Sequence, residues 1–416
     1  MIYTNTYKAE KQNYYFMNGA NRMVQNFLSN YSFPNGLTLK NRVVMSPMTT
    51  MASFHNGMVT SDELAYYEMR AGGPGMIITG VANVSENGKG FEGELSATTD
   101  SMIPGLTKLS KSIKQDGTKA ILQIFHAGRK SSTKILRGTQ PVSSSALKAV
   151  YPEDSEVPRA LSENELLQII DDFGEATRRA ILAGFDGVEL HGANTYLLQQ
   201  FFSENSNQRL DDWGGSLEKR LKFILCVIDT VNETVKKYAD KPFIVGYRLS
   251  PEEIETPGIR LKDSLYLVEK IKNEIDYIHL SIGSYKRTSL NEKDNNATLI
   301  SQFAAITQGV VPLIGVGSVE LPEDAENVLA DGADLVAVGR ELIREPHWVQ
   351  KIEAGDIESI RTKLSPFDMD ELAIPTVMQV YLKEAFSSVM HFTTDSNAIQ
   401  NYSDSLAPME GFEKKL

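Results

Sequence analysis

The residues best suited to chemistry follow an apolar run at residues 187–191. His191, Asn194 and Tyr196 occur close together there. The side chains of His191 and Asn194 can both donate hydrogen bonds to one carbonyl oxygen, which would stabilise the negative charge that develops when a nucleophile adds to a conjugated system. The Tyr196 hydroxyl, with an ordinary pKa of about 10, suits proton donation to a carbanion or enolate. A single histidine at a strand end is more often structural, so the prediction depends on all three residues.

Two glycine-containing segments predict a site for an anion. Gly315, Gly317 and Ser318 end one apolar run, and Gly339 and Arg340 follow the next. Glycine lets backbone N–H groups approach an anion closely, and a helix N-terminus adds positive potential. The guanidinium of Arg340 would add a fork of donors. We therefore predict a phosphate site, with the alternative that these glycines serve only tight turns.

One cation is expected at the end of a buried strand. Arg248 closes the apolar run 243–248. A buried cation needs an anionic partner, which is either a ligand or a local carboxylate in a structural ion pair. The residues alone leave both interpretations open.

Other signals do not predict sites. Residues 88–93 match the pattern GxGxxG, but they lie in a polar loop without a following apolar helix, so we reject a dinucleotide-binding motif. The single cysteine, Cys226, excludes a disulfide and a cysteine-ligated cluster within one chain. His55, His279 and His347 lack the spacing of metal ligands, so no metal site is expected.

The elements that must position these residues alternate along the chain. Apolar runs with little polar alternation predict strands buried on both faces of a parallel sheet, and segments of helical periodicity, such as 162–183, 216–236, 263–275 and 322–331, separate them. This alternation favours a (β/α)8 barrel, in which active sites form at the C-terminal ends of the strands. The second choice, a doubly wound open sheet, would place a glycine-rich turn after its first strand. The predicted strands are 42–48, 75–81, 120–125, 187–191, 243–248, 277–281, 311–316 and 334–338.

Length and composition fit an ordinary soluble enzyme. The chain has 416 residues, of which 41% are hydrophobic and 23% charged. Its net charge of -12 gives no general reason to bind nucleic acid or an anionic membrane. No transmembrane helix or secretory signal is apparent, so we expect a cytoplasmic protein. We expect an extension at 1–32, a barrel at 33–351, and a helical extension with a polar tail at 352–416.

Several longer motifs resemble a known family. The segments that carry the resemblance are 39–49, 123–129, 184–201, 206–223, 248–251 and 333–348, and the most specific are HGANTYLLQQF and GGSLEKR. Together they resemble the old yellow enzyme family of FMN-dependent NAD(P)H:flavin oxidoreductases of the ene-reductase type. The resemblance covers most of the chain, from about residue 33 to 350.

The resemblance implies noncovalent FMN at the mouth of the barrel, with NADH or NADPH as reductant. It assigns His191 and Asn194 to the substrate oxygen and Tyr196 to proton donation. Gly80 stands where the family often carries an acidic residue, and Thr49 where one subgroup has cysteine. By position, the expected cofactor residues are Pro47, Met48, Thr49 and Gly80 around the flavin ring, Gln123 and Arg248 at its pyrimidine side, and Gly317, Ser318, Gly339 and Arg340 at the phosphate.

The expected function is therefore reduction of the activated C=C bond of α,β-unsaturated carbonyl compounds. Hydride would come from flavin N5, and a small molecule would be the substrate. Reduction of quinones, nitro compounds or dienoyl thioesters at the same site is an alternative, and a non-catalytic flavin-binding barrel is another. A flavin-free aldolase or epimerase would need a Schiff-base lysine or a metal cluster at the strand ends, and neither is visible. The natural substrate, the choice between NADH and NADPH, and a homo-oligomeric state are left open.

Overall fold

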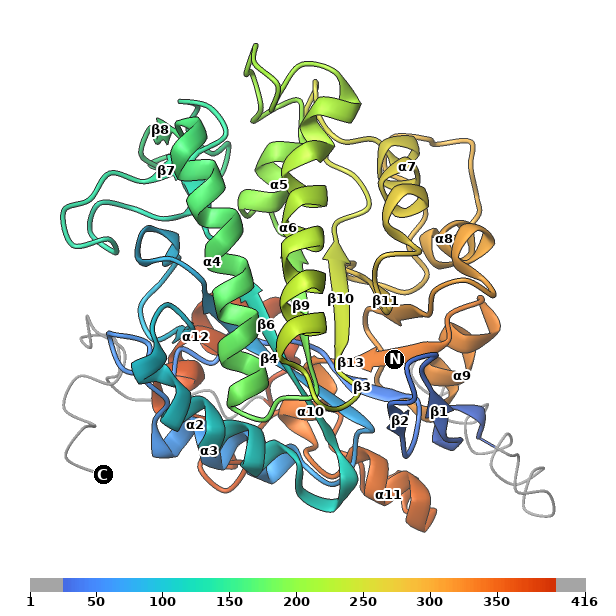
Figure 1. Cartoon of the computed structure of the whole chain (residues 1–416). Helices are drawn as coiled ribbons and strands as arrows, with labels where there is room; N and C mark the ends of the chain where they lie inside the picture. The colour runs from blue at the N-terminus through green and yellow to red at the C-terminus, as the bar shows by residue number, and fades with distance from the viewer. Residues whose placement is uncertain (1–24, 394–416) are drawn as a thin grey trace.

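A closed barrel of eight parallel strands forms the centre of the molecule (Figure 1). The computed structural model describes residues 25–393, so the expected extension 1–32 and tail 352–416 lie partly outside the described residues. The strands pair in chain order, and the first pairs with both the second and the last, which closes the barrel. The predicted (β/α)8 barrel is confirmed, and the open sheet is wrong. The strands are β3 (Val43–Met45), β4 (Met76–Asn83), β6 (Lys119–Phe125), β9 (Gly187–Gly192), β10 (Ile244–Leu249), β11 (Tyr277–Leu280), β12 (Leu313–Val316) and β13 (Leu335–Val338).

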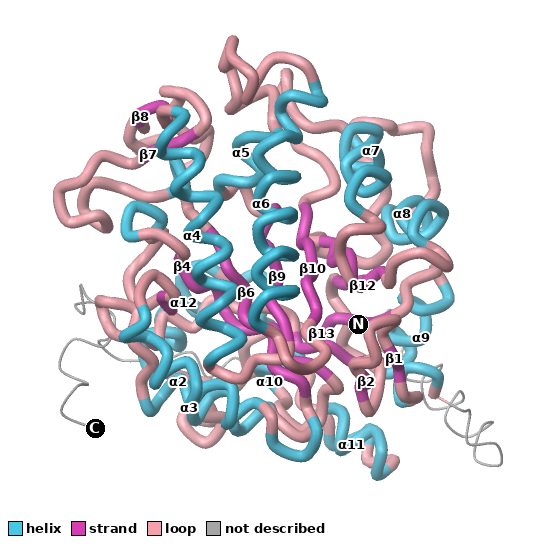
Figure 2. The backbone as a smooth tube through the Cα atoms, viewed as in Figure 1, coloured by secondary structure: helices cyan, strands magenta, loops and turns pink. Residues whose placement is uncertain are grey.

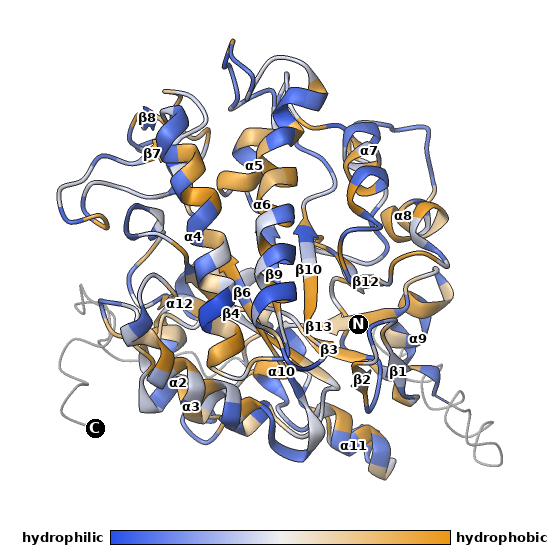
Figure 3. Ribbon diagram, in the orientation of Figure 1, coloured by the Kyte–Doolittle hydropathy of each residue, from blue (hydrophilic) through white to orange (hydrophobic). Residues whose placement is uncertain are grey.

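Each strand of the barrel is followed by at least one helix (Figure 2). The barrel strands are buried along almost their whole length, as expected for strands that face a barrel interior on one side and helices on the other. In Figure 3, β10 passes from orange at its start through a pale middle to blue near its end, and Arg248 is the next-to-last residue of this strand. The helices are α2 (Ser61–Arg70), α3 (Ile103–Ile113), α4 (Glu163–Leu182), α5 (Leu197–Phe202), α6 (Leu217–Tyr238), α7 (Leu261–Ile271), α8 (Leu299–Thr307), α9 (Pro322–Ala330) and α10 (Arg340–Arg344).

Local capping explains where the predicted helices begin. Helix α6 starts after Ser216, whose hydroxyl accepts a hydrogen bond from the backbone N–H of Lys219. Helix α7 begins earlier than the predicted 263–275, because the carboxylate of Asp263 accepts the backbone N–H of Arg260 and so lies in the first turn rather than before it. It ends at Ile271, and the following residues turn into β11.

Segments outside the barrel pack against it at both ends of the described chain. Short strands β1 (Tyr31–Ser32) and β2 (Thr38–Leu39) form an antiparallel pair, and Phe27 stacks near Trp348 at 5.8 Å. After α10, the chain continues through α11 (Trp348–Ala354), α12 (Thr376–Ala385) and α13 (Ser387–Met390). None of the helices among residues 25–393 is both long and apolar enough to cross a membrane.

Candidate active site

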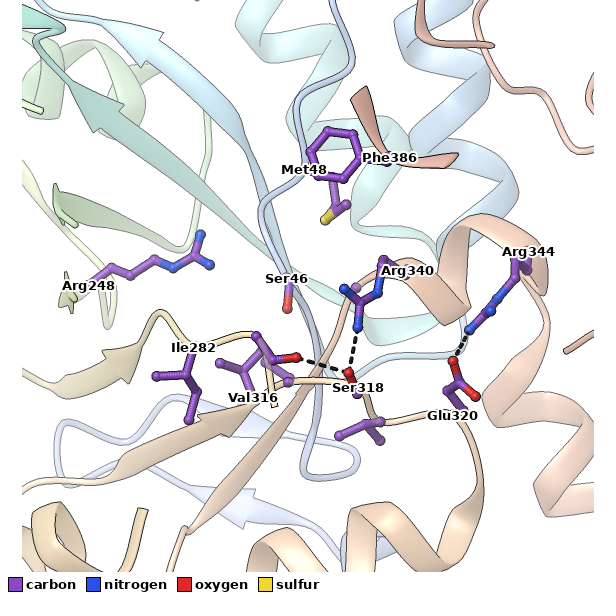
Figure 4. A pocket seen from close by; sticks show the side chains of 15 residues that line it. Ser46, Met48, Arg248, Ile282, Val316, Ser318, Glu320, Arg340, Arg344 and Phe386 are labelled. Atoms are coloured by element: carbon purple, nitrogen blue, oxygen red, sulfur yellow. Dashed lines mark hydrogen bonds and ion pairs between the residues drawn. The ribbon is translucent and has the colours of Figure 1, made fainter. Parts of the chain in front are cut away.

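A cavity of about 150 Å³ lies at the C-terminal ends of several strands. Figure 4 shows Arg248 and Arg340 facing it from opposite sides, with Phe386 above Met48. Six residues predicted to bind the cofactor line it, namely Met48, Arg248, Gly317, Ser318, Gly339 and Arg340. The structure therefore brings together residues from β3, β10, β12 and β13 that the sequence separates widely.

The loops after β12 and β13 are joined by hydrogen bonds. The guanidinium of Arg340 donates to the hydroxyl of Ser318 at 2.6 Å, and this hydroxyl donates to the carbonyl of Gly283 at 2.9 Å. Gly317 has a φ of 120°, and a methyl group there would lie 2.7 Å from the backbone of Ser284. Only glycine fits this conformation and this close approach. We call Gly317, Ser318, Gly339 and Arg340 the phosphate end of the site.

Three buried polar atoms at the site lack a hydrogen-bond partner among the described residues. They are the Ser46 hydroxyl, Nε of Arg248 and Nδ1 of His191. Orphaned buried polar atoms are rare in folded proteins, and two of these three, on Ser46 and Arg248, lie at one cavity, which is typical of a ligand site. No carboxylate in residues 25–393 lies within salt-bridge distance of Arg248, so a closed structural ion pair does not account for this cation.

A buried carboxylate organises the barrel interior below Arg248. Glu189, on β9, accepts hydrogen bonds from Nε2 of Gln123 at 2.7 Å and from Nδ1 of His279 at 2.8 Å. Burial alone would raise the pKa of Glu189, but His279, Arg248 and these hydrogen bonds lower it below its ordinary value. Glu189 is thus an anion that orients Gln123 and counterbalances Arg248.

His191 and Tyr196 form a compact aromatic group at the end of β9. Their ring centres lie 5.1 Å apart, and Phe125 packs edge-on against Tyr196 at 4.9 Å. Burial and the neighbouring charge of Arg248 lower the pKa of His191 well below its usual value, so its ring is neutral at physiological pH. Burial first, and then the nearby Glu94 and Tyr381, raise the pKa of Tyr196, which keeps its proton.

Asn194 is placed differently from the prediction. Its side-chain oxygen accepts a hydrogen bond from Ser281 at 3.3 Å, and its backbone N–H donates to Ser250. Among the described residues, no hydrogen bond joins Asn194 to His191. Asn194 and Thr195 both adopt left-handed backbone conformations, with φ of 57° and 65°. The turn that follows β9 thus directs the exposed Asn194 side chain toward β11.

The segment after β3 and the middle of β4 contribute to a second cavity of the site. Pro47 is buried, and Thr49 lines a second, smaller cavity together with Gly80. A methyl group at Gly80 would lie 2.8 Å from the carbonyl oxygen of Met48. The acidic residue that the family often carries at this position therefore has no room here.

Four residues at the site were not among those expected from the sequence, namely Glu63, Glu94, Tyr381 and Phe386. Glu63 and Glu94 are buried carboxyl groups in the wall of the smaller cavity. Tyr381, on α12, interacts through its hydroxyl with the side chain of Thr49, and Phe386 lines the larger cavity. The only sequence feature that could have pointed to Glu94 is its place directly after the glycine-rich residues 88–93. The segment that contains Tyr381 and Phe386 has no feature that would mark it as part of the site.

Comparison with known proteins decides the family. The sequence pattern of the NADH:flavin oxidoreductase / NADH oxidase family matches residues 33–358. The chain belongs to this family, that of old yellow enzyme. It is 46% identical over 336 residues to an NADH:fumarate oxidoreductase of Klebsiella pneumoniae, covering 80% of this chain and 36% of that protein. It is 41% identical over 346 residues to a probable NADH-dependent flavin oxidoreductase, YqiG, of Bacillus subtilis, covering 83% of this chain and 92% of that protein.

Solved structures agree with this assignment. Morphinone reductase in complex with tetrahydroNAD superposes with a TM-score of 0.67 at 29% identity, covering 80% of this chain and 91% of the reductase. The chain spans about a third of the length of the Klebsiella relative but nearly all of the Bacillus one. The barrel is thus a module that occurs both within longer proteins and almost alone.

Family membership identifies FMN as the cofactor of this barrel, and the printed names of the family and of YqiG refer to NADH as the reductant. The residues present fit that cofactor. The glycine loops and Arg340 offer donors for a phosphate, and the unpartnered Arg248 Nε offers a cation for a ring edge that gains negative charge on reduction.

Proposed function

We propose that this protein reduces the activated C=C bond of α,β-unsaturated carbonyl compounds with electrons from NADH or NADPH. The observation that carries the proposal is the pairing of neutral His191 with protonated Tyr196, their rings 5.1 Å apart, beside the unpartnered Arg248. One group can polarise an oxygen and the other can supply a proton.

The cofactor would be held along the strand ends. Gly317, Ser318, Gly339 and Arg340 would bind the phosphate of noncovalently bound FMN, and Arg248 would face its pyrimidine side. Gln123 would present its amide oxygen there, because its amide nitrogen is bonded to Glu189. When bound, FMN supplies the hydride chemistry that no side chain can perform. The remaining wall would be formed by Pro47, Met48, Thr49 and Gly80.

The chain's own residues would bind and protonate the substrate. His191 would donate a hydrogen bond to the substrate oxygen, since a neutral ring still carries one N–H. Asn194 would join it only if its amide turned away from Ser281. Tyr196 would transfer its phenolic proton to the α-carbon.

The relatives suggest which substrates to test. The name of the Klebsiella protein refers to fumarate, a conjugated dicarboxylate. Among the described residues at the Tyr196 side of this site, the buried ionisable groups include His191, Glu63 and Glu94, and the nearby cation Arg248 is assigned to the cofactor. This distribution favours a neutral enone or enal over a dicarboxylate.

Stopped-flow spectroscopy of the FMN-loaded protein tests the proposal. NADH or NADPH should bleach the flavin absorbance, and a cyclic enone should restore it. Replacing Tyr196→Phe should slow the second step by about 100–10,000-fold, the range for a positioned proton donor, and leave the first unchanged. Equal slowing of both steps would remove Tyr196 from the donor role, and failure of enones, enals and fumarate to reoxidise the flavin would refute the proposed function.

A further inference from the structure

One wall of the larger cavity comes from a part of the chain that lies beyond the family's barrel. Phe386 lines this cavity, yet the sequence pattern of the family ends at residue 358. The ring of Phe386 lies above Met48, at the heart of the site (Figure 4). Because the family match stops before this residue, family membership gives it no role.

The segment that carries Phe386 begins and ends at one point of the molecule. The backbone N–H of Leu364 donates to the carbonyl of His391 at 3.2 Å, and the N–H of Thr393 donates to the carbonyl of Leu364 at 3.0 Å. These bonds close the segment into a loop whose two ends lie side by side. We call residues 364–392 the C-terminal strap.

Arg344 fastens both ends of the strap to the phosphate end of the site. Its guanidinium donates to the carbonyl of Thr362 at 3.1 Å and to Nδ1 of His391 at 3.2 Å. It also donates to the carboxylate of Glu320 at 2.7 Å, as Figure 4 shows, and Arg344 and Glu320 both line the larger cavity. Glu320 follows Ser318 in the loop after β12, so one buried side chain joins that loop to the strap.

The strap is seated on the barrel along its length. The buried side chain of Arg70, at the end of α2, donates to the carbonyl of Leu372 at 3.1 Å and to that of Ile343 at 3.3 Å. Apolar side chains of the strap join the main hydrophobic core. The strap is therefore a fixed wall of the site. Its buried apolar residues are Leu364, Met369, Leu372, Ile374, Met378, Leu382 and Met390.

Phe386 differs from these residues in its position. It lies between α12 and α13, where the backbone leaves the helical conformation, and it is only partly buried, whereas Leu382 and Met390 on either side of it are buried. Its ring packs edge-on against Tyr381 at 5.2 Å, which fixes its orientation at the cavity. A fixed aromatic ring at the edge of a cavity offers apolar surface to a ligand.

We propose that the C-terminal strap retains the cofactor and that Phe386 is an FMN-binding residue. Arg248 and Arg340 offer positive charge in this cavity, and Phe386 and Met48 offer the apolar surface that suits an aromatic ring system. The inference rests on the part of the proposed function in which FMN occupies the larger cavity. It does not depend on which substrate the reduced protein uses.

Phe386→Ala tests the contact in the FMN-loaded protein. FMN should bind about 10-fold more weakly, mainly through faster dissociation, because an apolar contact is lost. Binding and release are measured by flavin fluorescence, which is independent of turnover. Phe386→Leu should keep most of the affinity. Phe367→Ala is the matched control, since Phe367 is an aromatic residue of the same strap that is 70% exposed and does not line the cavity.

His391→Ala tests whether the strap holds Phe386 in place. His391 does not line the cavity, and its side chain accepts a hydrogen bond from Arg344. Without this bond, FMN should dissociate about 2–10-fold faster. His391→Asn should show a smaller change, because an amide oxygen can accept the bond and asparagine tolerates the φ of 53° at this position.

Hydrogen exchange of the wild type gives a readout without any substitution. Binding of FMN should slow amide exchange in residues 376–390 and leave that of α11, which does not line the cavity, unchanged. Equal FMN affinity in Phe386→Ala and the wild type, or equal losses in Phe386→Ala and Phe367→Ala, would refute the assignment of Phe386. Unchanged exchange in residues 376–390 would refute the retaining role of the strap.

The cofactor and the substrate fail in different ways in these experiments. A wild type that binds no FMN would overturn this inference together with the placement of the cofactor. A wild type that binds FMN and loses it faster in Phe386→Ala, but reduces no enone, would support the inference and overturn only the proposed function.

Discussion

The two ends of this site are built in opposite ways. The phosphate end consists of two short loops that follow adjacent strands, held by the Arg340–Ser318–Gly283 hydrogen bonds around an open cavity. The other end, which we call the proton-transfer end, comprises His191 and Tyr196, which lie close together at the end of β9, and the buried Glu63 and Glu94, which come from distant segments of the sequence. One end therefore depends on backbone geometry and positive charge, and the other on burial and neutral ionisable groups.

The difference shows how one barrel can divide cofactor binding from chemistry. Donors for a dianionic phosphate work best when they are fixed and cationic. A proton donor and a hydrogen-bond donor for a neutral oxygen work best when both stay uncharged until the reaction occurs. Burial lowers the pKa of His191 and raises that of Tyr196, which keeps both side chains in their neutral forms.

The largest expected effect concerns stability and belongs to the proton-transfer end. Burial raises the pKa of Glu63 from 4.5 to about 7, so in this pH range the folded protein binds more protons than the unfolded chain. The stability due to the protonated group is full below pH 4.5 and is lost as the pH rises to about 7, a change of about 3 kcal/mol.

Glu63→Gln removes this titration. Chemical denaturation of wild type and variant from pH 4 to 8 should give a difference in unfolding free energy that moves in favour of the variant as the pH rises. If the difference in unfolding free energy stayed constant with pH, Glu63 would have the same pKa in the folded and unfolded states. That result would contradict a protonated Glu63 in the wall of the smaller cavity.

At the phosphate end, the largest effect should come from Gly317→Ala. A φ of 120° and a contact of 2.7 Å with the Ser284 backbone make the new methyl group incompatible with the loop. A strain of about 1–3 kcal/mol should weaken FMN binding about 10–100-fold, measured by quenching of flavin fluorescence. Gly283→Ala is the matched control, because Gly283 lines the same cavity and a methyl group there meets nothing within 4 Å. Equal losses in both variants would show that cavity volume, and not backbone geometry, governs this end.

The same contrast explains what the sequence could predict. Strand ends were predictable because buried apolar runs stop where polar or glycine residues begin, and this placed Arg248, Gly317 and Arg340 at one mouth. Glu94, Tyr381 and Phe386 were missed because their contacts depend on how a loop and a C-terminal helix fold back over the barrel. The expected convergence of Asn194 with His191 was not found, since spacing alone does not reveal the left-handed backbone at Asn194 and Thr195.

A smaller effect should follow from His191→Ala. This change removes a neutral N–H donor at the proton-transfer end, so a phenolate ligand over the flavin should bind about 10-fold more weakly, measured by its charge-transfer absorbance. FMN affinity should be unchanged, because His191 does not line the phosphate-end cavity. Unaltered phenolate binding would assign recognition of the oxygen to another residue. Asn194→Ala is the informative comparison, and given the Ser281 contact it should have less effect.

The smallest expected effect concerns backbone strain at Thr195. A β-branched residue with a φ of 65° is strained by about 1–2 kcal/mol, and its side chain makes no hydrogen bond with another described residue. Thr195→Gly should relieve that strain, and the greater freedom of glycine in the unfolded chain offsets about 0.4–1 kcal/mol. Unfolding by urea should therefore show a net gain of about 0.5–1 kcal/mol. Asn194→Gly should gain less, because asparagine tolerates left-handed conformations. If Thr195→Gly also slowed enone reduction without affecting reduction by NADH, the strained turn would serve to hold Tyr196 in place. A loss of stability in this variant would show that the Thr195 side chain supports the turn.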